Sequence, residues 1–245
     1  MKFTAQDVYN KLMNDDQILT SSGQIVFKFG DIGIIVKQKD VVGNIMQEWV
    51  KEWLAQNRIT YEISQNTQMP PDFYLDPSDK TVDLLEVKAF DNNRGPGFDI
   101  ADFRMFAAEA IDKPYMLDAD YLIFGYVMNN GVVRIKNLFL KKVWEITCSS
   151  ADWPMKLQVK QNVVHKIRPS TWYSSKVTFK PFTCLEHFVS ALEQTVYQNA
   201  DTRHMAGKWQ NRFLKSYQDH YGKPQLPSDI GSTLILGATS DKKTA

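Results

Sequence analysis

The sequence predicts an α/β fold in which a mixed central sheet is flanked by helices, and three observations predict it. The 245 residues are 43% hydrophobic and 23% charged, which is enough apolar side chain to bury a core and too much for a disordered chain. Apolar residues between 42 and 128 change period in the order helix, three strands, helix, strand. No repeat or low-complexity linker divides the chain, so we expect a single domain over 1–245 with a basic C-terminal elaboration.

The first 40 residues predict a short helix followed by a hairpin. Thr4 and Asp7 are typical of a helix N-terminus. Two β-rich runs, Gln24–Phe29 and Ile32–Lys37, flank a Gly-Asp turn. We therefore expect these two runs to pair as antiparallel strands.

The predicted core begins with an amphipathic helix from Val42 to about Asn57, where apolar residues recur at three- and four-residue spacing. The elements that follow are three strands, a helix and a strand, at Ile59–Ser64, Asp72–Leu75, Val82–Phe90, Ile100–Ile111 and Tyr121–Met128. Turn residues between the second and third strands predict a hairpin. The catalytic core is thus expected at about 42–128.

Beyond residue 128 the pattern is less regular. Val132–Leu140 and Lys142–Thr147 indicate strand or mixed structure, 150–180 shows little period, and Thr183–Gln198 and Lys208–Tyr221 are helical by pattern. We expect a DNA-binding elaboration at about 131–225 and a polar tail at 226–245.

The formal net charge of +1 conceals a division along the chain. Residues 1–130 hold 12 Lys and Arg against 20 Asp and Glu, whereas residues 131–225 hold 15 against 6. The segment 141–185 is the most basic, with eight basic residues against two acidic ones and with aromatic residues interleaved. Such a segment is suited to neutralising DNA phosphates, and the alternative is a solvated basic face whose aromatic residues pack in the core.

The residues that point to chemistry are Asp72, Glu86 and Lys88. On a strand, Glu86 and Lys88 share one face, while Leu85 and Val87 face the other. A turn centred near Asp79 places Asp72 opposite Glu86, so that two carboxylates share one surface. These oxygen ligands suit Mg²⁺, and Lys88 can orient a water that attacks a phosphodiester. The alternative is a surface hairpin with solvated charges.

The same residues resemble the signature of the PD-(D/E)XK nuclease superfamily, in particular type II restriction endonucleases. Pro71-Asp72 with Glu86-Val87-Lys88 matches the motif, and the element order of 42–128 matches the family's αβββαβ core. The resemblance implies that Asp72 and Glu86 bind Mg²⁺ and that Lys88 assists the attacking water. In the family an acidic residue on the preceding helix often adds to the metal site. Here the spacing from the glycine indicates Gln47 rather than Glu48, a departure that leaves three alternatives for this helix: a ligand, a water-mediated contact or no contribution.

The C-terminal part is similar in general character to the NgoBV/NlaIV group of restriction enzymes. The similarity lies in two stretches, Arg168-Pro-Ser-Thr-Trp172-Tyr-Ser-Ser and Phe179-Lys-Pro-Phe-Thr-Cys-Leu-Glu-His187. It implies a GGNNCC-type target.

Two segments are candidates for DNA contact. One follows the catalytic strand, and the other lies in the basic part of the chain; both offer donors for base edges and phosphates. Their candidate residues are Asn92, Asn93, Arg94, Lys166, Arg168, Ser170, Thr171, Trp172, Tyr173 and Lys176. Asn, Gly, Pro and Ser also suit ordinary turns, so specificity and turn chemistry remain alternatives here.

The sequence favours Mg²⁺-dependent hydrolysis of double-stranded DNA at a short palindromic site, leaving 5′-phosphate and 3′-hydroxyl ends. A palindromic site favours a homodimer of two-fold symmetry. The alternatives are a repair or junction-resolving nuclease, a DNA-binding protein without catalysis, and a small-molecule metallohydrolase.

Apolar runs are too short to span a membrane and no signal peptide is evident, so we expect a cytoplasmic protein. No phosphate-binding loop indicates a nucleotide cofactor, and Cys148 and Cys184 form no disulfide framework.

Overall fold

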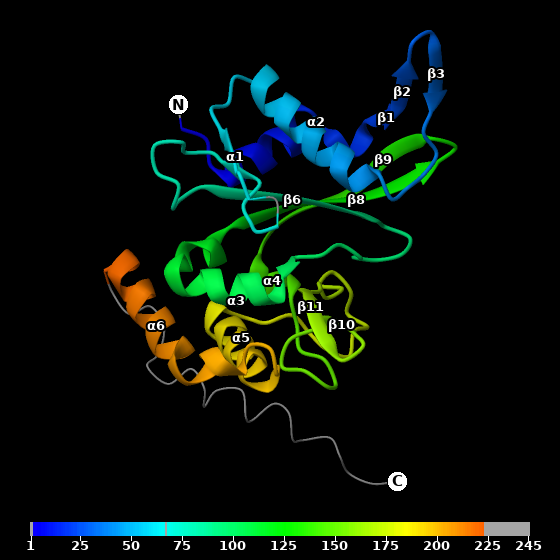
Figure 1. Ribbon diagram of the computed structural model, residues 1–245. Helices are drawn as coiled ribbons and strands as arrows, with labels where there is room; N and C mark the ends of the chain where they lie inside the picture. The colour runs from blue at the N-terminus through cyan, green and yellow to red at the C-terminus, as the bar shows by residue number, and fades with distance from the viewer. Residues whose placement is uncertain (1, 67, 223–245) are drawn as a thin grey trace. The chain divides into compact units, whose positions relative to one another are not determined.

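A computed structural model describes residues 2–66 and 68–222 of the chain (Figure 1). Residue contacts divide it into two compact units that alternate along the sequence. Unit 1 comprises Met1–Phe98 and Ala119–Lys142, and unit 2 comprises Asp99–Asp118 and Val143–Ala245. The segment expected to be the catalytic core therefore draws on both units. The polar tail expected at 226–245 lies outside the described residues.

Unit 1 contains a six-stranded sheet in the order β1-β9-β8-β6-β5-β4. Its strands are β1 (Ser22–Gln24), β4 (Glu62–Ile63), β5 (Phe73–Tyr74), β6 (Leu84–Asp91), β8 (Asp120–Asn129) and β9 (Val132–Lys142). β6 and β8 run parallel, and the other neighbouring strands run antiparallel. The sheet is therefore mixed, which confirms the predicted mixed α/β class.

Helices of unit 1 cover one face of this sheet. They are α1 (Ala5–Asn10), continued by the π-helical turn η1 (Lys11–Asp15), and α2 (Val42–Gln56), with the short 3-10 turn η2 (Ile18–Thr20) between them. The Thr4 hydroxyl accepts from the Asp7 N–H, and the Asp7 carboxylate accepts from the Thr4 N–H, so the predicted N-cap is a capping box. The predicted helix from Val42 is also confirmed.

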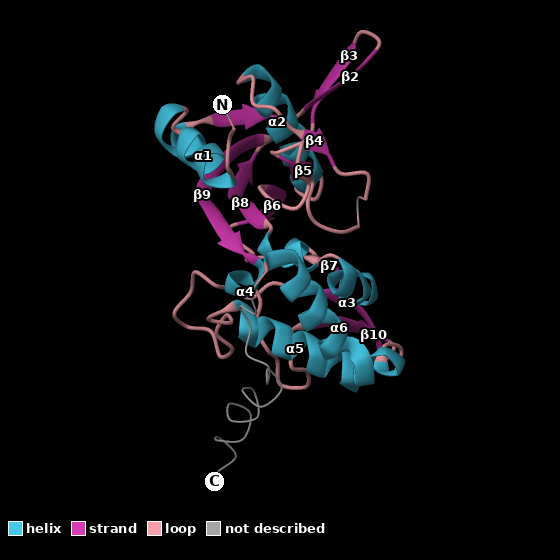
Figure 2. Cartoon of the chain, turned by 90° about the vertical axis from the view of Figure 1, so that its left-hand side faces the viewer, coloured by secondary structure: helices cyan, strands magenta, loops and turns pink. Residues whose placement is uncertain are grey.

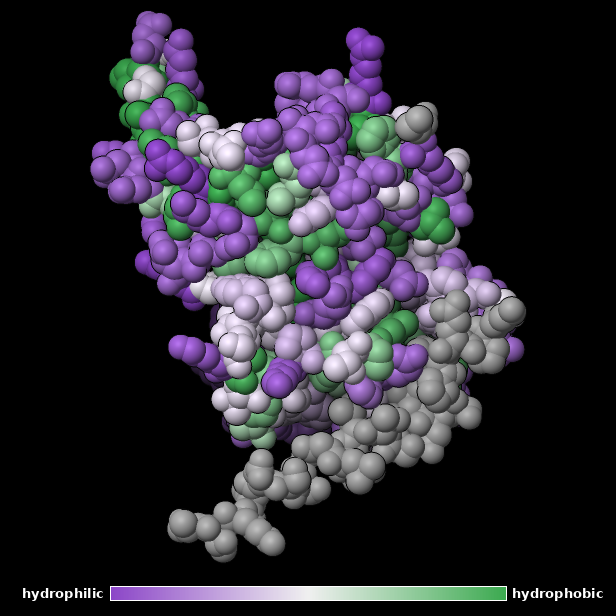
Figure 3. Space-filling model, turned by 180° about the vertical axis from the view of Figure 1, so that it is seen from behind, coloured by the Kyte–Doolittle hydropathy of each residue, from purple (hydrophilic) through white to green (hydrophobic). Residues whose placement is uncertain are grey.

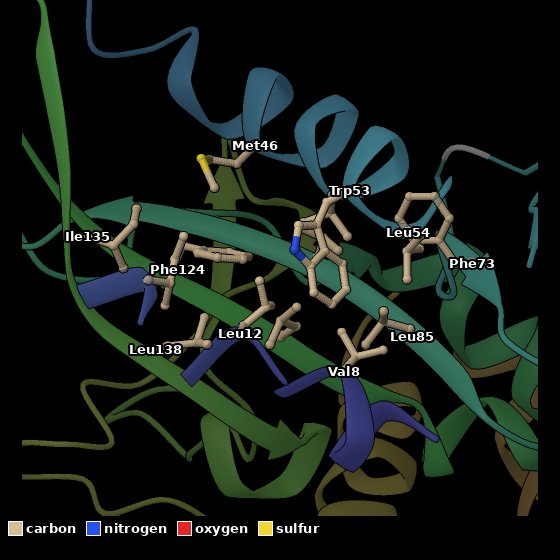
Figure 4. Close-up of a cluster of buried hydrophobic side chains, with 14 of the residues drawn as sticks. Val8, Leu12, Met46, Trp53, Leu54, Phe73, Leu85, Phe124, Ile135 and Leu138 are labelled. Carbon is tan, nitrogen blue, oxygen red and sulfur yellow. The ribbon is translucent and has the colours of Figure 1, made fainter. Parts of the chain in front are cut away.

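The core of unit 1 lies between these helices and the sheet (Figure 4). Met46, Trp53 and Leu54 of α2 point toward Leu85 and Phe124 of the sheet. Val8 of α1 and Leu12 of η1 are fully buried in the same cluster. Burial of large apolar side chains at this spacing is what the helical periodicity predicted.

A hairpin of two further strands, β2 (Val26–Phe29) and β3 (Ile32–Ile35), forms a separate two-stranded sheet in unit 1. It projects away from the six-stranded sheet (Figure 2). The predicted hairpin with its Gly-Asp turn is confirmed.

Unit 2 is mainly helical and carries a three-stranded sheet in the order β10-β11-β7. Its elements are β7 (Ala101–Asp102), α3 (Phe103–Asp112), η3 (Pro114–Asp118), α4 (Val143–Ile146), β10 (Leu157–Lys160), β11 (Val163–Ile167), α5 (Leu185–Gln198) and α6 (Arg203–Tyr221). The Trp209 indole of α6 donates to the Ala107 carbonyl of α3 at 2.6 Å, which joins the two helices. All three predicted helices of this part are present.

The structure defines two segments beyond residue 128 that the sequence pattern left loosely described. The segment Lys142–Thr147, expected as strand or mixed structure, is mostly the helix α4. The region 150–180, which shows little regular period, contains the β10–β11 hairpin. Each element has five residues or fewer, so neither extends far enough to establish a period.

Candidate active site

The β5–β6 hairpin brings Asp72 and Glu86 together. Phe73 pairs with Leu85 and Tyr74 with Leu84, and continuing this antiparallel register by one residue places Asp72 opposite Glu86. The Asp72 N–H donates to the Leu85 carbonyl at 3.0 Å, which fixes that register beyond β5. The juxtaposition expected from a turn centred near Asp79 is therefore present.

Lys88 lies on the same surface as the two carboxylates. Its Nζ is 2.7 Å from Oε1 of Glu86, as expected for side chains two residues apart on a strand. Only 4% of the Glu86 side chain and 21% of the Lys88 side chain are exposed. Both side chains are therefore much less exposed than they would be on a surface hairpin with solvated charges.

Burial changes the protonation of Asp72. Desolvation and the neighbouring Glu86 carboxylate raise the pKa of Asp72 to about 7, although Lys88 and the Val87 N–H act to lower it. The Val87 N–H donates to Asp72 Oδ2 at 2.8 Å. Two carboxylates held this close repel each other when both are ionised, so a cation placed between them would stabilise the ionised pair.

The donor set fits a hard divalent cation. Oε2 of Glu86 is buried and has no hydrogen-bond partner among the described residues, so it is available for another ligand. Across residues 2–66 and 68–222, no group of three or more His, Cys, Asp or Glu side chains is placed to hold a metal ion. A protein usually contributes one or two carboxylates to a Mg²⁺ site, and water and phosphate oxygens supply the remaining ligands.

Gln47 and Glu48 on α2 occupy different environments. The Gln47 Nε2 donates to Asp72 Oδ1 at 2.5 Å, which leaves its carbonyl oxygen for a ligand or water. The Glu48 side chain is 69% exposed and pairs with Lys51. The structure therefore brings Gln47, and not Glu48, to the carboxylate pair.

Tyr121 is a residue of this site that sequence reasoning missed. On β8 it is the parallel-strand neighbour of Glu86, and its buried hydroxyl has no hydrogen-bond partner in the described part of the chain. Burial and the charges of Glu86 and Asp72 raise the pKa of this hydroxyl well above its ordinary value. In the sequence, only the position of this tyrosine at the start of the apolar run Tyr121–Met128 could have indicated it.

The candidate DNA contacts after β6 divide into one internal residue and two surface residues. The Asn92 Oδ1 accepts from the Asn137 Nδ2 of β9 at 2.8 Å, so Asn92 links two strands. Asn93 is exposed, and the Arg94 side chain is 81% exposed. Asn93 and Arg94 are therefore accessible to a ligand.

The second set of candidate contacts lies in unit 2. Lys166 pairs with Asp102 at 3.6 Å, and Arg168 pairs with Asp99. Ser170 is buried, whereas Tyr173 and Lys176 are exposed. Thr171 and Trp172 are half-buried, and Trp172 packs edge-on against Tyr173. Burial leaves Ser170 unable to reach a DNA surface in this conformation.

Residues 2–66 and 68–222 include no helix with the length and apolar composition needed to cross a membrane.

The chain is similar to known restriction enzymes along most of its length. The model of the family described as NgoBV restriction endonuclease matches residues 2–229. The type II restriction enzyme NlaIV of Neisseria lactamica is 57% identical over 225 residues, which cover 91% of this chain and 93% of that protein. The type II restriction enzyme NgoBV of Neisseria gonorrhoeae is 50% identical over 162 residues, covering 66% and 92% respectively.

A solved structure described as NlaIV restriction endonuclease matches the fold with a TM-score of 0.88 at 57% identity. The match covers 91% of this chain and 92% of that one. These similarities decide between the functional classes that the sequence left open: the protein is an enzyme that cleaves double-stranded DNA. The chain belongs to the NgoBV restriction endonuclease family and is a type II restriction endonuclease.

Proposed function

We propose that this enzyme is a Mg²⁺-dependent endonuclease of the PD-(D/E)XK type, with Asp72, Glu86 and Lys88 as its catalytic residues. The observation that carries the proposal is the buried cluster in which Asp72 lies opposite Glu86 and Lys88 contacts Glu86. A buried pair of carboxylates is unfavourable without a cation. A bound divalent cation would offset the repulsion and the desolvation cost of Asp72 and Glu86, which the fold alone does not compensate.

Each residue has a distinct role in the proposed reaction. Asp72 and Glu86 hold the cation, and Gln47 orients Asp72 through its amide N–H. When bound, Mg²⁺ neutralises charge on the phosphate and makes water a better nucleophile. Lys88, held beside Glu86, orients the attacking water and stabilises the negative charge that develops during attack. The products carry 5′-phosphate and 3′-hydroxyl ends.

The proposal extends to DNA recognition and assembly. The two units act as one endonuclease domain in the cytoplasm, and a homodimer cuts both strands of a short palindromic site, for which GGNNCC is the first sequence to test. Asn93 and Arg94, which are exposed, contact DNA beside the catalytic strand. Lys166, Arg168, Thr171, Trp172, Tyr173 and Lys176 bind in unit 2, where Lys166 and Arg168 exchange their aspartate partners for phosphates.

One cleavage experiment tests the proposed function. The protein is incubated with phage DNA and Mg²⁺, and the products are separated on a gel and sequenced at their ends. Discrete bands whose ends map to one palindrome are expected. A smear would indicate cleavage without site specificity, and DNA left intact with Mg²⁺, Mn²⁺ and Co²⁺ in turn would overturn the proposed metal dependence.

A further inference from the structure

The β2–β3 hairpin exposes an unusual amount of apolar side chain. Six of its eight strand residues are large, apolar and between 44% and 80% exposed. These residues are Val26, Phe27, Phe29, Ile32, Ile34 and Ile35. Figure 3 shows hydrophobic side chains on this hairpin and on the adjoining surface of unit 1.

The register of the hairpin gathers four of the six on one face. Phe27 pairs with Ile34, and Phe29 pairs with Ile32. Side chains of directly paired residues, and of residues two apart, share a face. The opposite face carries Lys28 and Gly33 between Val26 and Ile35. One face of the hairpin is therefore wholly apolar.

The hairpin is held firmly at its base. The Val36 N–H donates to the Ile25 carbonyl at 2.9 Å, which extends the ladder. Ile35 packs against the β8–β9 turn at Gly131, where a Cβ would come within 2.3 Å of Ile35 Cγ2. The apolar face is thus presented in a defined direction.

The exposed apolar area of this hairpin is large enough to favour contact with a partner. The four side chains of the apolar face are 54% to 80% exposed, which corresponds to roughly 500 Å² of apolar surface, since a large apolar side chain offers about 150–250 Å². The largest apolar patch on a monomeric protein is about 300–600 Å² and is often functional, and an isolated two-stranded hairpin is marginally stable in water. A stable protein interface buries about 800 Å² on each partner, so this face supplies a large part of that area and a second surface must supply the rest.

Charge argues against DNA as the occupant. Within Val26–Ile35 the only charged residues are Lys28 and Asp31, so the hairpin has no net charge. Affinity for DNA depends mainly on basic side chains that neutralise phosphates. The hairpin is suited to an apolar protein surface.

Unit 1 also contains a groove lined largely by apolar side chains. A pocket of about 400 Å³ lies between α2, the η2–β1 segment and β9. Apolar side chains lining it include Ile18, Ile25, Ile45, Trp49 and Val133. Ile45 and Trp49 are themselves partly exposed, so the groove is open to a partner.

We propose that two copies of this chain associate by placing the β2–β3 hairpin of each copy on the α2 groove of the other. A hairpin and a groove on the same unit allow a reciprocal exchange, which is the pattern of a two-fold interface. This inference rests on the proposed homodimer and assigns the surface through which it forms.

The test compares the mass in solution of the full chain and of two double variants by sedimentation velocity without DNA. The wild type is expected at twice the mass of the chain. Phe29→Asp with Ile32→Asp is expected at the monomer mass, with an unchanged far-UV spectrum because both side chains are exposed. Val159→Asp with Val163→Asp, which adds the same charge to exposed positions of the β10–β11 hairpin, is the matched control and is expected to remain dimeric.

The groove is tested by mixing. Ile45→Asp alone is expected to be monomeric, and its mixture with the Phe29/Ile32 variant is expected to form a heterodimer through the one intact hairpin and groove. A mixture that stays monomeric would overturn the assignment of the groove.

Two other outcomes would overturn the inference itself. They are a monomeric wild type and a Phe29/Ile32 variant that remains dimeric; if the dimeric variant also loses DNA binding, the hairpin contacts DNA instead. Cleavage of phage DNA by the wild type is scored separately. A dimer that cuts no DNA would contradict the proposed function and leave this inference standing. A monomer that cuts at one site would overturn this inference together with the proposed homodimer and leave the proposed cleavage reaction standing.

Discussion

Two hairpins of unit 1 distribute polar and apolar side chains in opposite ways. The β5–β6 hairpin buries the charges of Asp72, Glu86 and Lys88 beside an apolar core. The β2–β3 hairpin exposes apolar side chains to solvent. Both arrangements cost stability in an isolated chain, the first through desolvation of charge and the second through hydration of apolar surface. Under the two proposals made above, each hairpin is completed by something outside the chain, a cation in one and a second copy of the chain in the other.

Substitutions in the β5–β6 hairpin are expected to have the largest effect, a loss in the rate of DNA cleavage. Glu86→Gln and Lys88→Ala are each expected to lower the rate of DNA cleavage by about 10²–10³-fold or more, because the first removes a carboxylate that holds the cation and the second removes the positive charge that stabilises the transition state. Single-turnover cleavage measures the rate, and gel shift in Ca²⁺ checks that DNA still binds. Glu62→Gln, on β4 of the same sheet but exposed and paired with Lys80, is the control and should cleave normally. Full activity in either catalytic variant would remove it from the proposed mechanism.

The next prediction compares how much a buried side chain of the β5–β6 hairpin and an exposed side chain of the β2–β3 hairpin contribute to the free energy of unfolding. Leu85→Ala, at a fully buried position of β6, is expected to lower the free energy of unfolding by about 2–5 kcal/mol. Phe29→Ala, at a position of β2 that is 80% exposed, is expected to change it by about 0.5 kcal/mol or less in the monomer. Urea unfolding at a concentration well below that of dimer formation measures both. A large loss in Phe29→Ala there would mean that the hairpin packs within its own chain.

A third prediction concerns pH and the buried Asp72. Its pKa is raised to about 7 in the folded protein from about 3.9 in an unfolded chain. The folded state therefore binds more protons between these values, and stability without metal declines as pH rises from about 4 to about 7. Asp72→Asn removes this decline and is expected to be more stable than the wild type at pH 8, on the order of 4 kcal/mol, but not at pH 4.

Urea unfolding in EDTA at the two pH values measures this difference. Asp79→Asn, in the turn between β5 and β6, is the control: hydrogen bonds from Thr81 lower the pKa of Asp79, so its removal should reduce stability above pH 4. An Asp72→Asn variant that is less stable than the wild type at pH 8 would show that the carboxylate stabilises the fold instead.

The smallest effect tests the base of the β2–β3 hairpin. Gly131 has a φ of +81° and faces Ile35, so Gly131→Ala is expected to cost about 1–2 kcal/mol from backbone strain alone and to displace the hairpin. Hydrogen exchange of the Val36 N–H is expected to accelerate. Gly23→Ala, where a Cβ would meet nothing within 4 Å, is the matched control. Equal exchange in the two variants would mean that the hairpin base is not anchored by this contact.

Much of the site followed from the sequence because it depends on local rules. Strand alternation placed Glu86 and Lys88 on one face, and turn chemistry near Asp79 fixed the register that brings Asp72 opposite Glu86. Tyr121 could not be found in this way. It lies 35 residues further along the chain, and only the parallel pairing of β8 with β6 brings it beside Glu86.

The choice between Gln47 and Glu48 depended on packing as well. The family's spacing indicated Gln47, but adjacent helical residues differ by about 100° in direction, and only packing shows which of the two side chains reaches Asp72. Docking of Met46, Trp53 and Leu54 against the core turns Gln47 toward Asp72 and leaves Glu48 exposed.

The sequence by itself determined the mixed α/β class, the order of the core elements and the acidic pair with its lysine, since these depend on periodicity and turn residues within short segments. The tertiary structure decided which elements group together, because α3 shares its contacts with unit 2 although it lies between strands of unit 1. It also decided that the alternating apolar residues of β2 and β3 stay exposed. Periodicity records which residues share a face, whereas burial depends on what the rest of the chain places against that face.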